Sequence, residues 1–559
     1  MYSPFHPLLR TNIVPSGRER HQIRDLLDES QVEVDKLTQE ITELQSLLDT
    51  ASKRRADLQD FMEEHTALLS PARRLPDDIV RVIFLASLPE TRNSALVSEE
   101  SPLLVSQICS AWRNIALSTP RLWAAIYIVV PGEAKLGQLT EQVGLWLTRS
   151  GAVPLSISLR LSGTAFSLDG PCNILSLLQL LVGESRRWCH VDITLPPQTT
   201  DCLVAMLSPG EVPFLRSIAL RRSPRRRYFR AVATPDSAAP LSFLGTPSLV
   251  SVTISSSIVD LQSPISWGTL RHLSIERGGL EHPFGVTHAV ALTILSRCQR
   301  LESCELSLVR KALDSTGSSS GSPGIPHFTL SHLNSLTLII HVQAIGDHTR
   351  FFHHASLPAL RSLHCQGAHD NGPSLRQSFL PDDLSNIESL TWDVQAFPRE
   401  LVLEALSELH GLRELRMLKE PFVPQMLPVI QIGGIVMEPT PAPPLPEWLR
   451  YLHVPESEPD TSHLVVCPRL QNLELMLFRP MPDADIVQLI RSRYRAPSVT
   501  SLERFTCMNS NTAKPESGVD VESQLQEQVA GGLELVVHWR PRKARMQVVY
   551  SALEGAVTV

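Results

Sequence analysis

The chain has 559 residues, of which 43% are hydrophobic and 19% are charged, and this globular balance excludes wholesale disorder. A formal net charge of −7 argues against nucleic acid as the main partner, because nucleic-acid-binding domains usually carry a basic excess. The nine cysteines contain no CxxC pair, so neither a zinc knuckle nor a disulfide framework is predicted. No apolar run approaches the ~18–20 residues that span a bilayer. We therefore expect no membrane association and a cytoplasmic or nuclear location.

The first predicted elements are a disordered tail over residues 1–20 and a heptad helix over residues 21–69. Neither proline nor glycine interrupts residues 18–70. The first heptad positions hold Leu27, Val34, Ile41, Leu48, Arg55, Met62 and Leu69, and the fourth positions hold Ile23, Ser30, Leu37, Leu44, Ala51, Leu58 and His65. This period predicts either a coiled coil with a partner helix or a second copy, or one amphipathic helix folded back on its own domain.

Two shorter amphipathic helices are predicted next. Leu75, Ile79 and Ile83 are four residues apart, with Asp77 and Asp78 in the first turn, where negative charge suits a helix N-terminus. After a polar stretch, a second helix is predicted from apolar residues at three-to-four spacing. These residues are Leu104, Ile108, Trp112, Ile115 and Ala116.

The order of these residues resembles the F-box. The matching segments are Leu75-Pro76-x-Asp78-Ile79-x-x-x-Ile83-Phe84, Val105-x-x-Ile108-Cys109-x-x-Trp112-Arg113 and Pro120-x-Leu122-Trp123. The heptad leader and Trp146-Leu147-x-Arg149-Ser150-Gly151 are similar to fungal, mushroom-type F-box proteins. The stretch from Pro89 to Pro102 departs from the pattern, because it is longer and more polar than the loop of most F-boxes. The alternative is a small helical hairpin in which Trp112 is an ordinary core aromatic.

The remainder of the chain repeats an apolar-x-x-apolar-x-apolar pattern. Its first positions run from residue 215 to 502 in steps of about 29 residues, at the upper edge of the leucine-rich period. The instances are Leu215/Ile218/Leu220, Leu249/Val252/Ile254, Leu270/Leu273/Ile275, Leu301/Cys304/Leu306, Leu333/Leu336/Leu338, Leu360/Leu363/Cys365, Ile387/Leu390/Trp392, Leu412/Leu415/Met417, Leu449/Leu452/Val454, Leu470/Leu473/Leu475 and Leu502/Phe505/Cys507. They predict a stack of strands with a shared core, and the alternative is an ordinary α/β domain with leucine-rich strand edges.

The predicted fold class is therefore α/β, with a long N-terminal helix, an all-α F-box cluster over residues 70–125 and an αβ leucine-rich-repeat-like solenoid over residues 126–559. Inserts are predicted near residues 221–240, 314–327 and 438–446. The first holds an arginine run that fits a nuclear import signal, an RNA contact or an exposed loop between repeats. The last holds PxxP spacings that fit either a polyproline ligand or a loop.

No catalytic residue, metal site or cofactor is predicted, and we do not expect an enzyme. Gly317, Ser319 and Gly321 spell G-x-S-x-G, but the prolines at 323 and 326 forbid the helix that a nucleophile elbow needs. The densest group of potential metal ligands is His353, His354, His364, Cys365 and His369. Because His364 and Cys365 are adjacent on a predicted strand, their side chains should diverge.

The F-box resemblance implies a function in ubiquitin ligation. F-box helices dock on the Skp-type adaptor of a cullin–RING ligase, and the following repeats bind a protein substrate. The residues that the resemblance assigns to the adaptor-binding fold are Leu75, Pro76, Ile79, Ile83, Phe84, Trp112 and Trp123. The residues expected to line a concave substrate-binding face are Thr253, Glu305, Thr337, His364, Thr391, Arg416, His453 and Glu474. The alternative is a scaffold outside any ligase that uses the coiled coil and the repeats.

Overall fold

The structure is a computed structural model of the whole chain. It describes residues 3–130, 132, 135–161, 174–222, 241–255, 264–276, 285–309, 327–340, 351–366, 381, 384–392, 399–417, 452–454, 466–477, 481–496, 499–509, 520–539, 548–551 and 555–558. The described residues divide between two compact units, Met1–Ile83 and Phe84–Val559. The predicted inserts at 314–327 and 438–446 lie outside the described residues except for His327, and the insert at 221–240 is described only at Arg221 and Arg222.

The first unit is dominated by one long helix, α1 (Gly17–Leu68), of 52 residues. It begins four residues before the predicted start because Ser16 and Glu19 form a capping box. The Ser16 backbone N–H donates to Glu19 Oε2 at 2.7 Å, and the Glu19 N–H donates to Ser16 Oγ at 3.4 Å. The short helix η1 (Pro71–Arg74) follows, and the boundary between the units falls within α2 (Asp77–Ala86). No helix in the described ranges has both the length and the apolar character that a bilayer crossing requires.

The second unit opens with α3 (Leu103–Ile108), α4 (Ser110–Leu117) and η2 (Pro120–Trp123). The prediction of one helix through Leu104 and Ile115 was wrong, because Cys109 adopts an extended conformation (φ −156°, ψ 168°) that separates α3 from α4. The Cys109 Sγ accepts a hydrogen bond from the Trp112 N–H at 3.5 Å and so caps α4. The apolar spacing continues across the break, which is why periodicity alone did not reveal it.

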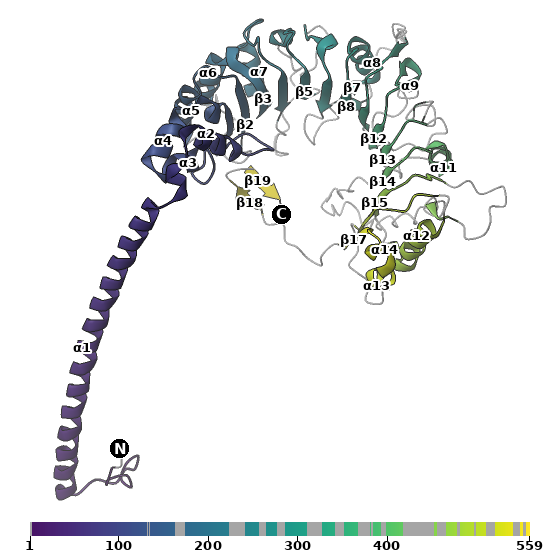
Figure 1. The fold of residues 1–559 in the computed structure, drawn as a ribbon. Helices are drawn as coiled ribbons and strands as arrows, with labels where there is room; N and C mark the ends of the chain where they lie inside the picture. Colours follow the sequence, from purple (N-terminus) through teal and green to yellow (C-terminus); the bar gives the residue numbers. More distant parts are fainter. Residues whose placement is uncertain are drawn as a thin grey trace, which may run out of the picture. The chain divides into compact units, whose positions relative to one another are not determined.

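The rest of the second unit contains a large sheet of 15 strands, whose described pairings are all parallel. Fourteen strands follow one another in chain order from β1 to β17, and β7 pairs beside β8 (Figure 1). The strands are β1 (Ala125–Val130), β2 (Leu155–Leu161), β3 (Trp188–Leu195), β4 (Ser217–Arg222), β5 (Ser251–Ser255), β6 (His272–Glu276), β7 (Val286–Thr287), β8 (Ser303–Val309), β10 (Ser335–Ile340), β12 (Ser362–Gln366), β13 (Ser389–Trp392), β14 (Glu414–Met417), β15 (Asn472–Leu477), β16 (Arg504–Asn509) and β17 (Glu534–Trp539). Two small sheets pair β9 (Phe328–Thr329) with β11 (Ala355–Ser356) and β18 (Val548–Ser551) with β19 (Gly555–Thr558).

Helical segments connect many of these strands, as parallel pairing requires. They are α5 (Leu136–Arg149), α6 (Leu175–Gly183), η4 (Ser185–Arg187), α7 (Pro197–Ala205), η5 (Ser242–Leu244), η7 (Trp267–Thr269), α8 (His288–Arg297), α9 (Phe351–His354), α11 (Arg399–Glu408), α12 (Asp483–Arg495), α13 (Val521–Gln524) and α14 (Gln526–Ala530). The larger helices lie along one face of the sheet (Figure 1). The core lies between them and the sheet, where the second and third apolar positions of the repeats, such as Ile218 and Leu220, are buried.

Ten of the eleven predicted apolar triplets form strands of this sheet. The prediction for Leu449/Leu452/Val454 was wrong, because Leu452–Val454 form no strand and β14 pairs directly with β15. Leu452 and Val454 are nevertheless buried, so their apolar character reflects the core rather than a place in the sheet.

The polar stretch that departs from the F-box pattern covers the open edge of the sheet. The Tyr127 N–H of β1 donates to the Ser94 carbonyl at 2.7 Å, and Ala95 forms a parallel bridge with Tyr127. The Asn93 side chain donates to Ser158 Oγ and accepts from Ser156 Oγ, both at 2.9 Å. Because an open strand edge is a template for unwanted pairing, this loop protects β1.

Candidate interaction surfaces

A single row of residues crosses the face of the sheet that lies opposite the buried apolar positions. We call it the central row. Successive strands pair these residues as Cα partners: Thr253, Ser274, Glu305, Thr337, His364, Thr391, Arg416, Glu474 and Thr506. Seven of the eight predicted substrate-facing residues therefore stand in one line. His453 is not in this line, because its segment forms no strand, so the strand position predicted for it was wrong.

A second row on the same face was missed from the sequence. It lies two residues earlier in each strand and is rich in serine, so we call it the serine row. Its members are Ser217, Ser251, His272, Ser303, Ser335, Ser362, Ser389, Glu414, Asn472, Arg504 and Glu534. The period of two along a strand would have found it, because residues two apart share a face.

Charged residues on β2, β3, β4 and β6 pair with one another at one end of this face. Arg221 donates to Asp192 Oδ1 at 2.7 Å and to Glu276 Oε2 at 2.9 Å, and Arg160 lies 3.9 Å from Asp192. Burial lowers the pKa of Arg221, but the hydrogen bonds and charges of Glu276 and Asp192 outweigh it and raise the pKa. Arg221 belongs to the predicted arginine run and is held by carboxylates within the fold. Its neighbour Arg222 is buried and donates to Asp201 at 2.5 Å.

A cavity of about 350 Å³ opens on the same face over β14–β17. Arg416 lies 2.8 Å from Glu414 and 3.4 Å from Glu474, and Arg504 lies 2.7 Å from Glu534. The lining residues are Glu414, Arg416, Asn472, Leu473, Glu474, Arg504, Thr506, Met508, Glu534, Val536 and His538. The Arg416 and Arg504 side chains remain 48% and 58% exposed, so these ion pairs leave charge open to a partner.

His364 lies between Thr337 and Thr391 in the central row. Its Nε2 atom is buried and has no hydrogen-bond partner within the described ranges. Burial, together with the positive charge of Arg416, lowers the pKa of His364. The ring is therefore neutral at pH 7.

The structure separates the seven predicted adaptor-binding residues by exposure. In the first unit, Ile79 and Ile83 of α2 are 45% and 44% exposed, and Leu75 and Pro76 before the helix are also exposed. Val82 beside them is 62% exposed, although the sequence did not single it out as a site residue.

The remaining three predicted residues lie in the second unit. Phe84 is buried and makes an edge contact with the half-buried Trp112, at 5.1 Å between ring centroids. Trp123 is buried, and its Nε1 donates to the Ala116 carbonyl at 2.9 Å. In this unit the exposed apolar side chains of α3 are Leu104 and Ile108.

The residues of the Trp146–Gly151 motif make packing contacts inside the second unit. Trp146 packs edge-on against Trp123 at 4.9 Å, and Arg149 Cζ lies 4.6 Å from the Trp123 ring centroid. Gly151 has φ +55°, which a glycine adopts without strain. The motif therefore joins η2 to α5.

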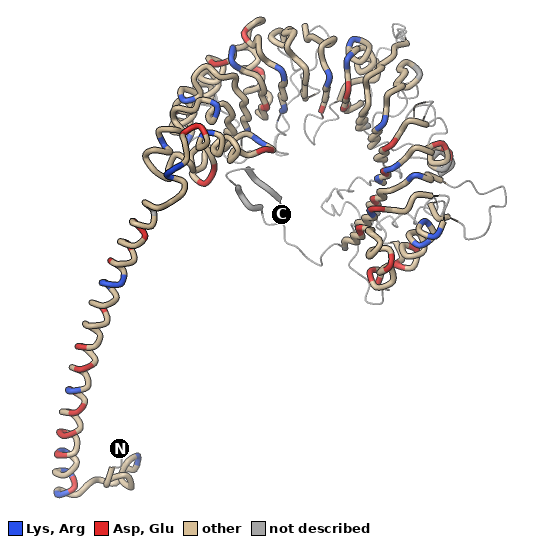
Figure 2. Tube along the Cα trace, in the orientation of Figure 1, with Lys and Arg blue, Asp and Glu red and all other residues tan. Residues whose placement is uncertain are grey.

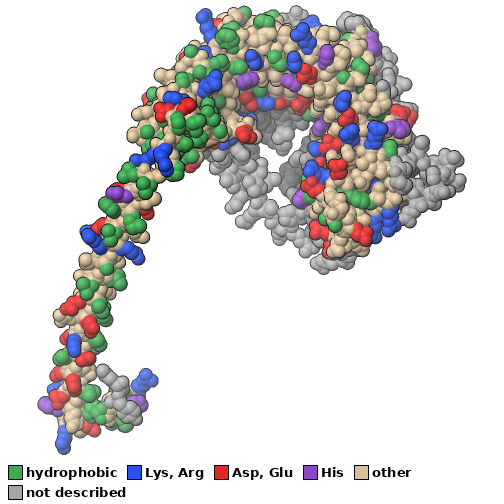
Figure 3. Space-filling view, in the orientation of Figure 1, with side chains coloured by type: hydrophobic (Ala, Val, Ile, Leu, Met, Phe, Trp, Pro, Cys, Tyr) green, Lys and Arg blue, Asp and Glu red, His purple; other side chains and the backbone are tan. Residues whose placement is uncertain are grey.

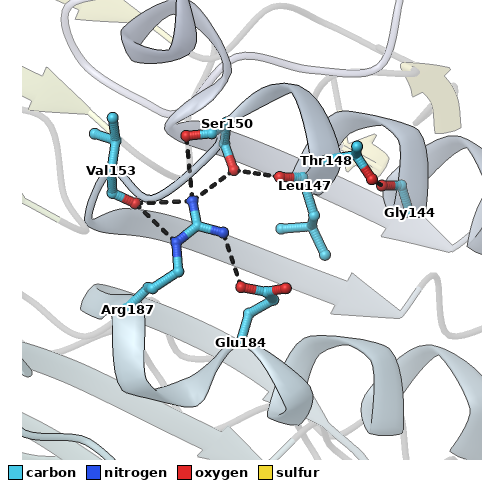
Figure 4. A network of polar contacts seen from close by, with 7 residues as sticks. All are labelled: Gly144, Leu147, Thr148, Ser150, Val153, Glu184 and Arg187. Carbon is cyan, nitrogen blue, oxygen red and sulfur yellow. Dashed lines mark hydrogen bonds and ion pairs between the residues drawn. The ribbon is translucent and has the colours of Figure 1, made fainter.

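Arg187 of η4 connects to the end of this motif through hydrogen bonds (Figure 4). Its guanidinium donates to the Val153 carbonyl at 2.9 Å and Ser150 Oγ at 2.6 Å, and pairs with Glu184 at 2.8 Å. Ser150 Oγ in turn donates to the Leu147 carbonyl at 2.5 Å (Figure 4). A cation at the end of α5 also suits the negative end of the helix dipole.

Within the described residues, no three potential metal ligands lie together. Comparison with protein-family models and with curated proteins found no match.

Proposed function

We propose that the chain is the substrate-recognition subunit of an SCF-type ubiquitin ligase, with residues 70–125 acting as an F-box and the parallel sheet forming a leucine-rich-repeat-like solenoid. The observation that carries the proposal is the apolar surface of α2. Ile79, Val82 and Ile83 are exposed on a helix of ten residues, whereas Val80 on the same helix is only 2% exposed. A helix with one buried side and an apolar exposed side is suited to docking on a partner protein.

The polar face of the sheet supports the second half of the proposal. The central row and the serine row together offer hydroxyls, carboxylates and guanidinium groups along eleven neighbouring strands, from β4 to β17. Mixed charge suits a protein surface better than a nucleic acid backbone, which would demand a basic face. The chain would contribute proximity rather than chemistry, by holding a substrate lysine near the charged ubiquitin-conjugating enzyme.

The test is binding of the full chain to a purified Skp-type adaptor. Ile79→Glu/Ile83→Glu places two charges on the exposed side of α2, and we expect binding to fall at least about a hundredfold. Leu145→Glu is the matched control, because Leu145 is an exposed apolar residue of α5, and it should bind like the wild type. Unchanged thermal unfolding of both variants would show that the fold is intact.

A wild-type chain that fails to bind the adaptor would contradict the ligase proposal. It would favour the scaffold alternative, for which the specific observation is the exposed apolar seam of α1. Leu37, Leu44 and Leu48 of that seam are all exposed.

A further inference from the structure

The long helix α1 presents an apolar seam to solvent along most of its length. Figure 3 shows hydrophobic side chains alternating with charged ones on this helix. The exposed members of the seam on α1 are Leu27, Val34, Leu37, Ile41, Leu44, Leu48, Leu58 and Met62, and Leu48 is 66% exposed. A seam that repeats every seven residues fits a second helix rather than a sheet or a small ligand.

We propose that α1 pairs with α1 of a second copy of this chain, and that the two helices run antiparallel. This inference is independent of the proposed ligase function. Its first support is the set of residues that interrupt the seam, Ser30, Ala51, Arg55 and His65. In a parallel pair each of them would face itself, which would leave small residues opposite each other and place two Arg55 charges together in the core.

These conflicts are removed in an antiparallel pair whose register sets Leu27 of one copy opposite His65 of the other. First heptad positions then face fourth positions of the other copy, and every interrupting residue meets a large apolar one. The layers are Leu27 with His65, Ser30 with Met62, Val34 with Leu58, Leu37 with Arg55, Ile41 with Ala51, and Leu44 with Leu48. The arginine and histidine can extend their polar ends to solvent beside a leucine, as long amphipathic side chains commonly do.

Charge complementarity is the second support. Residues 25–43 hold seven acidic side chains and one lysine, whereas residues 53–55 read Lys-Arg-Arg. Figure 2 shows the charged positions along the helix. The antiparallel register brings the basic block beside the acidic one of the other copy. A parallel pair would align like charge with like charge.

One interhelical pair expresses this complementarity most directly. Glu40 and Arg54 both occupy seventh heptad positions, which flank each other across an antiparallel seam. Glu40 of each copy therefore meets Arg54 of the other, and the pair forms twice by symmetry. In a parallel pair these positions would face Gln45 and Gln59, so no ion pair would form.

The antiparallel arrangement also has a geometric consequence. In this register Leu68 of one copy lies opposite Arg24 of the other. At 1.5 Å per residue, the two copies of Leu68 would therefore lie about 65 Å apart along the helix pair. The two chains would then continue from opposite ends of the dimer.

The first experiment measures the oligomeric state of the full chain by sedimentation equilibrium. We expect the wild type to be a dimer at micromolar concentration. Leu44→Glu puts a carboxylate into both central layers and should raise the dimer Kd about a hundredfold. Gln39→Glu makes the same charge change at a sixth heptad position, away from the seam, and should leave the Kd unchanged. A monomeric wild type, or a dimer indifferent to Leu44→Glu, overturns the proposal.

The second experiment tests the orientation by reversing charges. Arg54→Glu sets two glutamates against each other twice and should raise the dimer Kd roughly tenfold at low salt. Glu40→Arg/Arg54→Glu restores opposite charges in the antiparallel pair and should return the Kd to the wild-type range. In a parallel pair residues 40 and 54 lie about 21 Å apart along the axis, so the second change would give no rescue.

Cysteine cross-linking gives an independent measure of orientation, because α1 contains no native cysteine. Leu47→Cys lies near the two-fold axis of the antiparallel pair and should form a disulfide-linked dimer under mild oxidation. Val34→Cys would do so only in a parallel pair. Cross-linking of Val34→Cys but not Leu47→Cys therefore overturns the antiparallel arrangement. None of these measurements depends on adaptor binding, so they test the dimer proposal independently of the ligase proposal.

Discussion

Arg493 on α12 is 1% exposed and donates hydrogen bonds to three backbone carbonyls. Its guanidinium donates to the carbonyls of Leu452 at 2.9 Å, Cys467 at 2.5 Å and Val466 at 3.5 Å. Burial lowers the pKa of Arg493 from its ordinary value. The side chain thus ties two separate stretches of chain to the C-terminal part of the sheet.

We expect Arg493→Met to lower the free energy of unfolding by about 3 kcal/mol, because it removes three donor contacts to carbonyls in a buried site. Arg493→Lys keeps one charged donor and should cost less. Urea denaturation of the full chain measures both. Equal stability of the wild type and Arg493→Met would contradict a structural role for these bonds.

His364 gives the stability a pH dependence of known sign. Its pKa is lowered by burial and by Arg416, so the folded chain binds the proton less readily than the unfolded chain. The stabilising contribution of the neutral ring is complete above the ordinary value of 6.5 and is lost as the pH falls toward the folded pKa. Wild type should therefore lose more stability than His364→Gln between pH 7 and about 5.5, as thermal unfolding measures.

At the scale of elements, the loop from Pro89 to Pro102 stabilises the fold by packing along the edge of β1. Asn93→Ala removes both side-chain hydrogen bonds, to Ser156 and to Ser158, and should lower the free energy of unfolding by about 1–2 kcal/mol. Asn114→Ala, at an exposed position of α4, is the matched control and should change little. Urea denaturation compares the two variants, and an equal effect would refute a specific role for the Asn93 contacts.

Elements with a regular period were predictable because their pattern is local. The seam of α1 and ten apolar triplets could be read directly, since core positions recur at fixed intervals. The break at Cys109 was not predictable, because apolar spacing continues through it. The failure at Leu452–Val454 has a similar cause, since burial by itself does not place a segment in a sheet.

The candidate site was predictable in part for the same reason. Strand alternation put seven residues into the central row, but nothing in the sequence showed which charges would meet. Arg221 contacts Asp192 and Glu276, which lie 29 and 55 residues away along the chain. Such pairs depend on strand order and register, which no local pattern specifies. The Asn93 contacts with β2 were missed on the same ground.

For the molecule as a whole, the proposed function requires an adaptor-binding surface on α2 and a separate substrate-binding surface on the sheet. A substitution in one surface should leave binding at the other unchanged. Arg416, Glu474 and Arg504 all line the cavity over β14–β17. Arg416→Ala/Glu474→Ala/Arg504→Ala removes charges that are largely exposed or paired on the surface, so the fold should tolerate it. We expect this variant to retain adaptor binding and to lose the proteins that co-purify with the wild type when the proteasome is inhibited.

Ile79→Glu/Ile83→Glu should give the opposite result, keeping those proteins while losing the adaptor. Quantitative mass spectrometry of both variants beside the wild type and Leu145→Glu measures the two losses in one experiment. If the triple alanine variant kept the full set of co-purifying proteins, this part of the sheet would not be the substrate surface. The charged cluster of Asp192, Arg221 and Glu276, on β3, β4 and β6, would then be the next candidate for the substrate surface.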